Sequence, residues 1–248
     1  MMTGAQAMVR CLEMEGVSVV FGYPGAAIAP FYDSLYDSSI RHILTRTEQG
    51  AGHAASGYAR ISGRPGVCVA TSGPGATNLF TAIATAYSDS IPLVAITGQV
   101  ALNQLGRDVF QEVDTTGAVE PFTKHSYLVK SAADLPRIFK EAFYIASTGR
   151  KGPVLIDVPV DIQRQLIDFS YPESVSIRGY KPPHAGHPLQ IRKVAQAIQG
   201  AKRPVICVGG GVFLSNAQQA IRSFAEKMEI PVVSTLMGVG AKIGRAHV

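Results

Sequence analysis

Short runs of apolar and β-branched residues alternate along the chain with segments in which apolar residues recur every three or four positions. The runs with strand character cover residues 17–23, 41–46, 66–73, 91–98, 126–130 and 152–159. Helical spacing covers residues 28–36, 48–61, 76–87 and 135–146. Such alternation is typical of a parallel sheet covered by helices on both faces. The sequence therefore predicts an α/β fold.

The alternation lapses between residues 163 and 188, a stretch that contains four prolines. It then resumes with a helical segment at 189–199, a strand at 204–211, a further helix and a strand at 230–235. We expect an N-terminal domain over residues 1–165, a linker over 166–188 and the start of a second, Rossmann-like α/β domain over 189–241. Two strands are too few to close a core, so this second domain is expected to be incomplete.

The last seven residues, "KIGRAHV", interrupt this pattern and resemble a translated sequencing adapter. We expect residues 242–248 to be non-native and the natural chain to continue differently.

Composition narrows the function classes. The chain is 46% hydrophobic and 17% charged, and its formal charge of +5 includes no basic run or stripe, so neither disorder nor a nucleic-acid partner is supported. The N-terminus lacks an apolar stretch long enough for export or membrane insertion, which favours a cytoplasmic protein with no membrane partner. Cys68 and Cys207 lie in apolar runs and are expected to be buried, and Cys11 has no obvious disulfide partner.

Glu48 stands where an apolar strand leads into a helix rich in Gly and Ala. Thr45 and Glu48 have the spacing of a capping box, so a purely structural role is one interpretation. Alternatively, this carboxyl group exchanges a proton with the nitrogen of a bound heterocycle. Periodicity does not separate the two interpretations.

Two glycine-rich turns follow strands and open helices. The first is "TSGPGATN" (71–78), whose free backbone N–H groups suit a ligand edge or an anion. It is neither a P-loop nor the dinucleotide fingerprint, because no Lys follows and Asn78 replaces the third Gly. The second is "VGGGV" (208–212), for which a tight connection is as good an interpretation as a cofactor contact. The six histidines form no metal set, and no local nucleophile motif occurs.

A series of motifs occurs in the order "FGYPGAAIAPFYDSLY", "TEQGAGHAASGYAR", "GVCVATSGPGATNLFTAIATAYSDSIPLVAITGQV", "GRDVFQEVD", "TKHSYLV", "GPVLIDVPVDIQ" and "STLMGVG". Together they resemble the N-terminal part of the acetolactate synthase (acetohydroxyacid synthase) large catalytic subunits, a thiamine-diphosphate enzyme family. The resemblance covers nearly all of residues 3–241. It implies a pyrimidine-binding domain followed by the start of the FAD-binding central domain.

The resemblance also implies roles for residues. Glu48 matches the glutamate that hydrogen-bonds N1′ of the cofactor's aminopyrimidine and promotes formation of the ylide nucleophile, while the cofactor does the carbon chemistry. The positions that match the aminopyrimidine and substrate side are Tyr23, Pro24, Gly25, Ala26, Ser72, Pro74, Asn78 and Gln99. Those that match the mouth of the substrate channel are Phe110, Gln111 and Lys124. Those that match FAD contacts are Arg150, Gly210, Thr235 and Leu236.

Four residues depart from the commonest family pattern. Ala26 replaces a glycine, Thr47 replaces a histidine, Arg107 replaces a threonine and Val109 replaces an alanine. The methyl group of Ala26 and the charge of Arg107 bear on substrate preference more than on reaction class. The family's Mg²⁺ motif, a G-D-G with a downstream Asn, does not occur in these residues, so we expect the metal ligands elsewhere and this chain to be inactive alone.

The family further implies a homodimer or higher oligomer with its active site at the subunit interface, a separate small regulatory subunit, and 2-keto-acid substrates. The expected reaction is decarboxylation of pyruvate and ligation to pyruvate or 2-ketobutyrate in branched-chain amino-acid biosynthesis. Other thiamine-diphosphate enzymes, namely pyruvate oxidase, a decarboxylase or sulfoacetaldehyde acetyltransferase, remain alternatives. A non-catalytic nucleotide-binding module is a third hypothesis.

Overall fold

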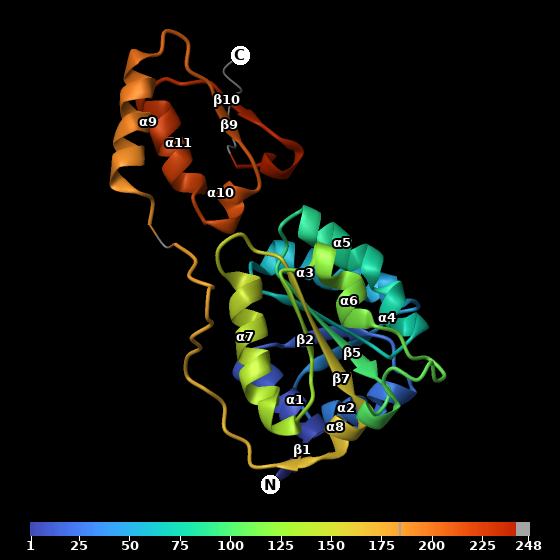
Figure 1. Ribbon diagram of the computed structural model, residues 1–248. Helices are drawn as coiled ribbons and strands as arrows, with labels where there is room; N and C mark the ends of the chain where they lie inside the picture. Colours follow the sequence, from blue (N-terminus) through green and yellow to red (C-terminus); the bar gives the residue numbers. More distant parts are fainter. Residues whose placement is uncertain (184, 242–248) are drawn as a thin grey trace. The chain divides into compact units, whose positions relative to one another are not determined.

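The computed structural model describes residues 1–183 and 185–241, and it divides the chain into a first unit, Met1–Lys181, and a second that begins at Pro182 (Figure 1). The tail that we expect to be non-native, residues 242–248, lies outside the described residues.

A six-stranded parallel sheet forms the centre of the first unit. Across the sheet the strands are β3 (Arg41–Leu44), β2 (Val19–Gly22), β4 (Gly66–Ala70), β5 (Leu93–Gln99), β7 (Pro153–Pro159) and β6 (His125–Leu128). Every residue of β4, β5 and β7 is buried, which explains why these strands are nearly continuous apolar runs in the sequence. The expected α/β class and parallel sheet are confirmed.

Helices cover both faces of this sheet (Figure 1). One face packs against α1 (Gly4–Met14), α2 (Ala29–Tyr36), α7 (Leu135–Ser147) and α8 (Val160–Arg164). The other packs against α3 (Glu48–Ser62), α5 (Phe80–Ser88) and α6 (Thr115–Val119), with α4 (Pro74–Asn78) leading into α5. Successive strand residues supply the two cores in turn: Val67 and Val69 face the first, and Cys68 and Ala70 the second.

Short elements complete the first unit. The antiparallel pair β1 (Met2–Thr3) and β8 (Leu166–Ile167) joins the start of the unit to the segment that follows α8. The 3₁₀ turns are η1 (Ala26–Ile28), η2 (Leu102–Gln104), η3 (Glu120–Phe122) and η4 (Ala132–Asp134). The helix expected over 76–87 is two helices, because Leu79 tightens the chain with a hydrogen bond from its N–H to the Ala76 carbonyl at 3.0 Å.

The stretch after β8 packs along the first unit. The side chains of Phe169, Tyr171, Ile177 and Tyr180 contact the core that α1 and α7 share with the sheet. The Tyr171 hydroxyl donates to Glu15 Oε1 at 2.6 Å. Residues up to Lys181 therefore group with the first unit, although they fall in the stretch that we expected to be a linker.

The second unit contains one parallel strand pair, β9 (Ile206–Val208) with β10 (Val232–Ser234). Its helices are α9 (Pro188–Gly200), α10 (Gly211–Leu214) and α11 (Gln218–Lys227), and η5 (Leu236–Gly238) follows β10. Few of its described side chains are buried, and α9 buries none. The prediction that Cys207 is buried is wrong: Cys207 is exposed, because β9 has one strand neighbour and little covers it among the described residues, whereas Cys11 and Cys68 are buried.

Candidate functional site

The parallel sheet brings several predicted site residues to one edge. Strands β3, β2, β4 and β5 are neighbours, and the segments that follow their carboxyl ends begin at residues 45, 23, 71 and 100. The carboxyl ends of parallel strands are the usual place for ligand sites in α/β folds. Glu48, the loop 23–26 and the turn 71–78 therefore belong to the same edge, and Gln99 is the last residue of β5.

Glu48 lies at the first position of α3 and is half-buried. Its Oε2 accepts a hydrogen bond from Asn78 Nδ2 at 3.0 Å, although the two residues are thirty positions apart. A methyl group built on Gly75 would lie 3.3 Å from Glu48 Oε1. Among the described residues Oε1 accepts no hydrogen bond, so this oxygen is available to a ligand.

The predicted capping box of Thr45 and Glu48 is wrong. The N-cap of α3 is Thr47, whose hydroxyl accepts from the Gly50 N–H at 3.0 Å. The Thr45 hydroxyl instead donates to the Thr47 carbonyl at 2.9 Å, because β3 ends before it and the chain turns there. Glu48 still lies in the first helical turn, where a carboxylate is favoured by the helix dipole. Its carboxyl group does not cap the helix, so the capping-box interpretation of Glu48 is excluded.

The turn 71–78 has a glycine, Gly75, beside Glu48 Oε1, whereas the Asn78 side chain bonds Oε2. Gly73 has φ 58°, in the left-handed region that favours glycine, and Pro74 begins α4. Ser72 is buried, and its carbonyl accepts from the Gly75 N–H at 3.2 Å. The turn is therefore held by its own backbone.

Thr71 joins this turn to the loop that follows β2. Its hydroxyl accepts from the Ala27 N–H at 3.2 Å. A methyl group on Gly25 would lie 2.5 Å from Thr71 Cβ, so this close approach requires glycine. Tyr23, Pro24 and Ala26 are exposed at the same edge.

Tyr32 lies beneath the site. Its hydroxyl donates to the Val69 carbonyl at 3.3 Å, and a methyl group on Gly22 would collide with it. Burial, with smaller contributions from Cys68 and Glu48, raises the pKa of Tyr32 well above its usual range, so this hydroxyl stays protonated and remains a donor.

Gln99 is buried and its amide is committed to internal hydrogen bonds. Nε2 donates to the Val113 carbonyl at 2.8 Å and to Asp157 Oδ2 at 2.9 Å, and Oε1 accepts from the Val100 N–H at 2.9 Å. The same Asp157 carboxyl group accepts from Thr97 Oγ1 at 2.6 Å. Burial raises the pKa of Asp157 from 3.8 to about 7; the two hydrogen bonds oppose this shift and the charge of Asp114 adds to it.

A loop from Gly106 to Val113 lies against the Gly73 turn. A methyl group on Gly73 would lie 2.8 Å from Gln111 Cα, and Gln111 itself has φ 60°. The Glu112 carboxylate accepts from the N–H groups of Gly106, Val109 and Arg107, and these bonds, that of Gly106 first, hold the pKa of Glu112 below its usual range. Phe110 is 87% exposed, so nothing described covers its ring.

The structure does not bring Lys124 and Arg150 to this edge. We expected Lys124 beside Phe110 and Gln111, but Lys124 precedes β6 and thus belongs to the amino end of the sheet. Its ammonium donates to the Ile145 carbonyl, to the Thr148 carbonyl at 2.7 Å and to the Tyr180 hydroxyl at 2.8 Å, at the carboxyl end of α7. Arg150 precedes β7, and its Nε donates to Ser90 Oγ at 2.8 Å, also at the amino end.

In the second unit, the turns after β9 and β10 lie side by side. The Thr235 N–H donates to the Val208 carbonyl at 2.9 Å, and a methyl group on Gly210 would lie 3.2 Å from Met237 Cβ. Gly210, Thr235 and Leu236 are therefore grouped, and Leu236 is 88% exposed.

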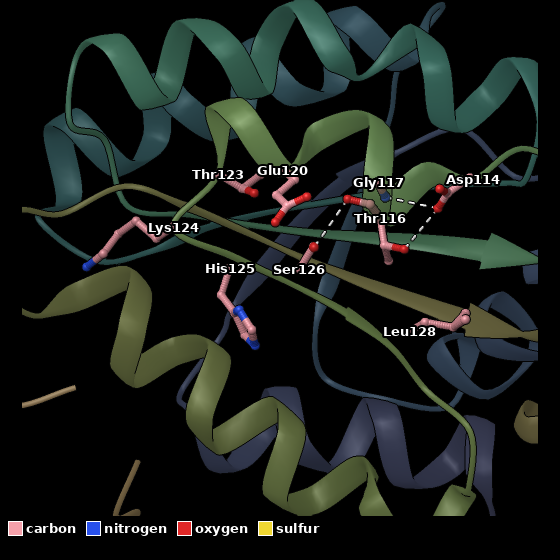
Figure 2. A pocket seen from close by; sticks show the side chains of 9 residues that line it. All are labelled: Asp114, Thr116, Gly117, Glu120, Thr123, Lys124, His125, Ser126 and Leu128. Atoms are coloured by element: carbon pink, nitrogen blue, oxygen red, sulfur yellow. Dashed lines mark hydrogen bonds between the residues drawn. The ribbon is translucent and has the colours of Figure 1, made fainter. Parts of the chain in front are cut away.

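A cavity of about 430 Å³ lies elsewhere, between α6 and the edge strand β6 (Figure 2). Its hydroxyl groups are bonded within the protein: Thr116 Oγ1 donates to Asp114 Oδ1 at 3.1 Å, and Ser126 Oγ donates to the Thr116 carbonyl at 3.3 Å. Figure 2 shows the Lys124 side chain extending away from these hydroxyls. None of the residues around Glu48 lines this cavity.

Within the described residues, no group of three or more His, Cys, Asp or Glu side chains is placed to hold a metal ion. No helix of that part of the chain is both long and apolar enough to span a bilayer.

Sequence reasoning missed three polar residues that support the site: Thr71, Glu112 and Asp157. A signal existed for Asp157, which is the one charged residue in the buried strand "PVLIDVP". A buried carboxyl group needs hydrogen-bond partners, so its position alone indicates a polar network. Thr71 and Glu112 act through contacts that no local pattern indicates.

Comparison with known proteins gives two family matches. Residues 2–118 match the N-terminal TPP binding domain of thiamine pyrophosphate enzymes, and residues 191–244 match the central domain of the same enzymes. The chain is 54% identical over 242 residues to a probable acetolactate synthase large subunit of Methanocaldococcus jannaschii, covering 96% of this chain and 41% of the relative. It is 53% identical over 240 residues to an acetolactate synthase large subunit of Corynebacterium glutamicum, covering 96% and 38%. The chain thus spans about 40% of the length of these relatives.

Proposed function

This chain belongs to the thiamine pyrophosphate enzyme family, and we propose that the protein it forms part of is an acetolactate synthase. Such an enzyme decarboxylates pyruvate and joins the remaining two-carbon unit to pyruvate or 2-ketobutyrate. The observation that carries the proposal is the pairing of Glu48 with Asn78 beside the glycine turn, in a chain about half identical to acetolactate synthases.

The residues around Glu48 fit thiamine diphosphate. Glu48 Oε1 has no described partner, and the space beside it exists because Gly75 has no side chain. The Asn78 amide fixes the other carboxyl oxygen. When bound, the cofactor supplies the nucleophilic carbon of the reaction. Glu48 holds or moves a proton at the cofactor's N1′ nitrogen, a role that requires a carboxyl group within hydrogen-bond reach.

The neighbouring residues shape the site. The loop of Tyr23, Pro24, Gly25 and Ala26 lies against Thr71, and this loop would hold the pyrimidine ring together with the turn that contains Ser72 and Pro74. Because the Gln99 amide is fully engaged, Gln99 acts by holding its neighbours in place. Phe110 and Gln111 lie on the substrate side, where the exposed ring of Phe110 is free to contact a ligand or a partner subunit.

The remaining assignments follow the family. FAD would contact Gly210, Thr235 and Leu236 in the central domain. Arg150 is proposed separately as an FAD contact, because it matches such a position in the family. The Mg²⁺ ligands would be supplied by residues outside this sequence. We further propose a cytoplasmic homo-oligomer with active sites at the subunit interface and a small regulatory subunit, since several relatives are named large subunits.

The test uses the complete gene product with thiamine diphosphate, Mg²⁺ and FAD. Acetolactate formed from pyruvate is measured for the wild type, for Glu48→Gln and for Glu120→Gln, an exposed control. Loss of the proton-transferring carboxyl group is expected to lower kcat about 100-fold or more in Glu48→Gln, whereas the control keeps the wild-type rate. Wild-type activity in Glu48→Gln, or acetate or acetaldehyde as the only product of the wild type, would contradict the proposal.

A further inference from the structure

A buried polar network connects the sheet to the loop on the substrate side. Its members are Thr97 and Gln99 on β5 and Asp157 on β7, all at most 1% exposed. Thr97 is the register partner of Asp157, and Gln99 lies two residues further along the same face of β5. The Asp157 carboxyl group thus lies between two side-chain donors in the interior of the sheet.

Gln99 extends this network to the loop. Its Nε2 has two hydrogens, and one is donated to Asp157 while the other is donated to the Val113 carbonyl. Its Oε1 accepts from the Val100 N–H, so the amide has a single orientation that satisfies all three partners. In its ionised form the Asp157 carboxyl group fixes that orientation, because both of its oxygens accept hydrogen bonds and neither offers a donor to a rotated amide.

The chain just before this loop is held by a further hydrogen bond. The Leu102 N–H donates to Asp161 Oδ1 at 3.1 Å, and Asp161 follows β7 in α8. Between these attachments the Glu112 carboxylate holds the loop together, because it accepts hydrogen bonds from the backbone N–H groups of Gly106 and Val109. The segment from Leu102 to Val113 therefore has an internal fold and two attachments. Leu102 is bonded directly to the Asp161 carboxyl group, and Val113 is bonded to the Gln99 amide, which in turn is bonded to the Asp157 carboxyl group.

The loop from Gly106 to Val113 contacts the turn 71–78 at Gly73. Gln111, two residues before Val113, makes the contact with Gly73 that leaves no space for a side chain. Gly73 precedes α4, and Asn78 at the end of α4 donates to Glu48. A continuous set of contacts thus runs from Asp157 through Gln99, the loop and the turn to Glu48.

We propose that Asp157 is a positioning residue: through Gln99 it holds the Val113 carbonyl, and so keeps the loop from Gly106 to Val113 seated on the Gly73 turn. The effect of this loop position on substrate binding rests on the proposed function, which puts Phe110 and Gln111 on the substrate side. The attachment itself does not depend on that function.

Three variants separate positioning from general stability. Asp157→Asn replaces one of the two acceptor oxygens by an NH2 donor, so position 157 no longer accepts hydrogen bonds from both Thr97 Oγ1 and Gln99 Nε2, and the Gln99 orientation is no longer fixed. Thr97→Val removes the other hydrogen bond to the same carboxyl group but leaves the Gln99 attachment intact, and it is the matched control. Asp157→Asn combined with Gln99→Glu restores a hydrogen bond between the two positions, while the carboxylate introduced at position 99 has no donor for the Val113 carbonyl.

The measurement is hydrogen exchange of the 248-residue chain, read by mass spectrometry in peptides covering residues 101–113, with the thermal midpoint recorded for each variant. Loss of the attachment is expected to speed loop exchange about tenfold in Asp157→Asn, the change expected for one hydrogen bond. Thr97→Val keeps wild-type loop exchange. The double variant recovers thermal stability relative to Asp157→Asn but keeps the fast loop, and it provides the test if Asp157→Asn does not fold.

Unchanged loop exchange in Asp157→Asn, equal acceleration in Thr97→Val, or full recovery of loop protection in the double variant would overturn the proposal. A second arm measures pyruvate kinetics of the complete enzyme, in which Asp157→Asn and the double variant are expected to raise KM several-fold with a smaller change in kcat. If the wild-type enzyme makes no acetolactate, the proposed function fails while the exchange result still stands.

Discussion

The space beside Glu48 depends on a single missing methyl group. A Cβ on Gly75 would lie 2.7 Å from Thr71 Cγ2 as well as 3.3 Å from Glu48 Oε1. The Thr71 side chain is short and already bonded to the Ala27 N–H, so it has little freedom to move. Steric conflict should therefore outweigh the better helix propensity of alanine, which is worth about 1 kcal/mol.

Gly75→Ala is expected to lower the free energy of unfolding by about 1 to 2 kcal/mol, the usual range for overpacking. Gly57→Ala is the matched control, because Gly57 lies inside α3 and a methyl group there meets nothing within 4 Å. The control should gain up to about 1 kcal/mol. Urea denaturation of both variants decides the matter, and a Gly75→Ala variant as stable as the control would show that the turn has more space than the structure indicates.

The sequence indicated which short motifs lie near one another at the edge of the sheet, but it did not indicate side-chain contacts that depend on distant segments. The motif containing Glu48 and the turn ending at Asn78 indicated two segments, and the sheet brings them within hydrogen-bond distance. Lys124 lies within a motif of the same family, yet its ammonium binds α7. A motif fixes residue identity, whereas side-chain direction depends on neighbours from other elements.

At the scale of elements, Lys124 acts as a cap for α7. Helix α7 ends at Ser147, and the last carbonyls of a helix lack backbone partners. Lys124 donates to the carbonyls of Ile145 and Thr148 and to the hydroxyl of Tyr180. A cation at the carboxyl end of a helix also interacts favourably with the helix dipole.

Lys124→Met is expected to lower the free energy of unfolding by about 1 to 3 kcal/mol, since it leaves part-buried acceptors without their charged donor. Lys130→Met is the control, because Lys130 is exposed in the same segment and should change stability by less than about 0.5 kcal/mol. Equal urea midpoints for the two variants would argue against the capping role.

Element prediction worked for the sheet because its buried strands are continuous apolar runs. All six expected strands form, and their ends differ from the predicted ones by at most three residues. Helices α6 and α8 have five residues each, too few to show a helical period. Helix α1 was not assigned although Thr3 and Gln6 form a capping box at its start. The strand order β3-β2-β4-β5-β7-β6 depends on contacts between distant segments, which local patterns do not encode.

At the scale of the whole molecule, Asp157 links stability to pH. Burial raises its pKa from 3.8 to about 7, so between these values the folded state binds a proton that the unfolded state releases. The contribution to stability is fully present below the unfolded pKa and is lost as the pH rises through the folded pKa. Its steepest slope is about 1.4 kcal/mol per pH unit.

Asn does not titrate, so the free energy of unfolding of the wild type minus that of Asp157→Asn should fall as the pH rises from about 4 to about 7 and then level off. Urea denaturation at intervals of half a pH unit measures this difference. A difference that stays constant across the range would mean that Asp157 remains ionised in the folded protein throughout.

Stability measurements can locate the C-terminal boundary of the first unit. Residues 168–181 contribute the Tyr171 contact with Glu15 and the Tyr180 contacts with Lys124 and Thr148. The ammonium of Lys140, which bonds Glu15 at 2.9 Å, also lies 5.3 Å from the centre of the Tyr171 ring. These contacts join the segment to both α1 and α7, so it should fold with the sheet although its sequence resembles a linker.

A chain ending at Lys181 should therefore unfold in one cooperative transition, whereas a chain ending at residue 165 should have a thermal midpoint lower by about 10 °C or more, because it loses several kcal/mol of apolar burial. The shorter chain also loses β8, so a third chain ending at Asp168 separates the loss of the strand from the loss of the aromatic contacts. If the chain ending at Asp168 is as stable as the one ending at Lys181, the aromatic segment adds nothing and the first unit ends at β8. If its midpoint lies close to that of the chain ending at residue 165, the segment is part of the folded domain.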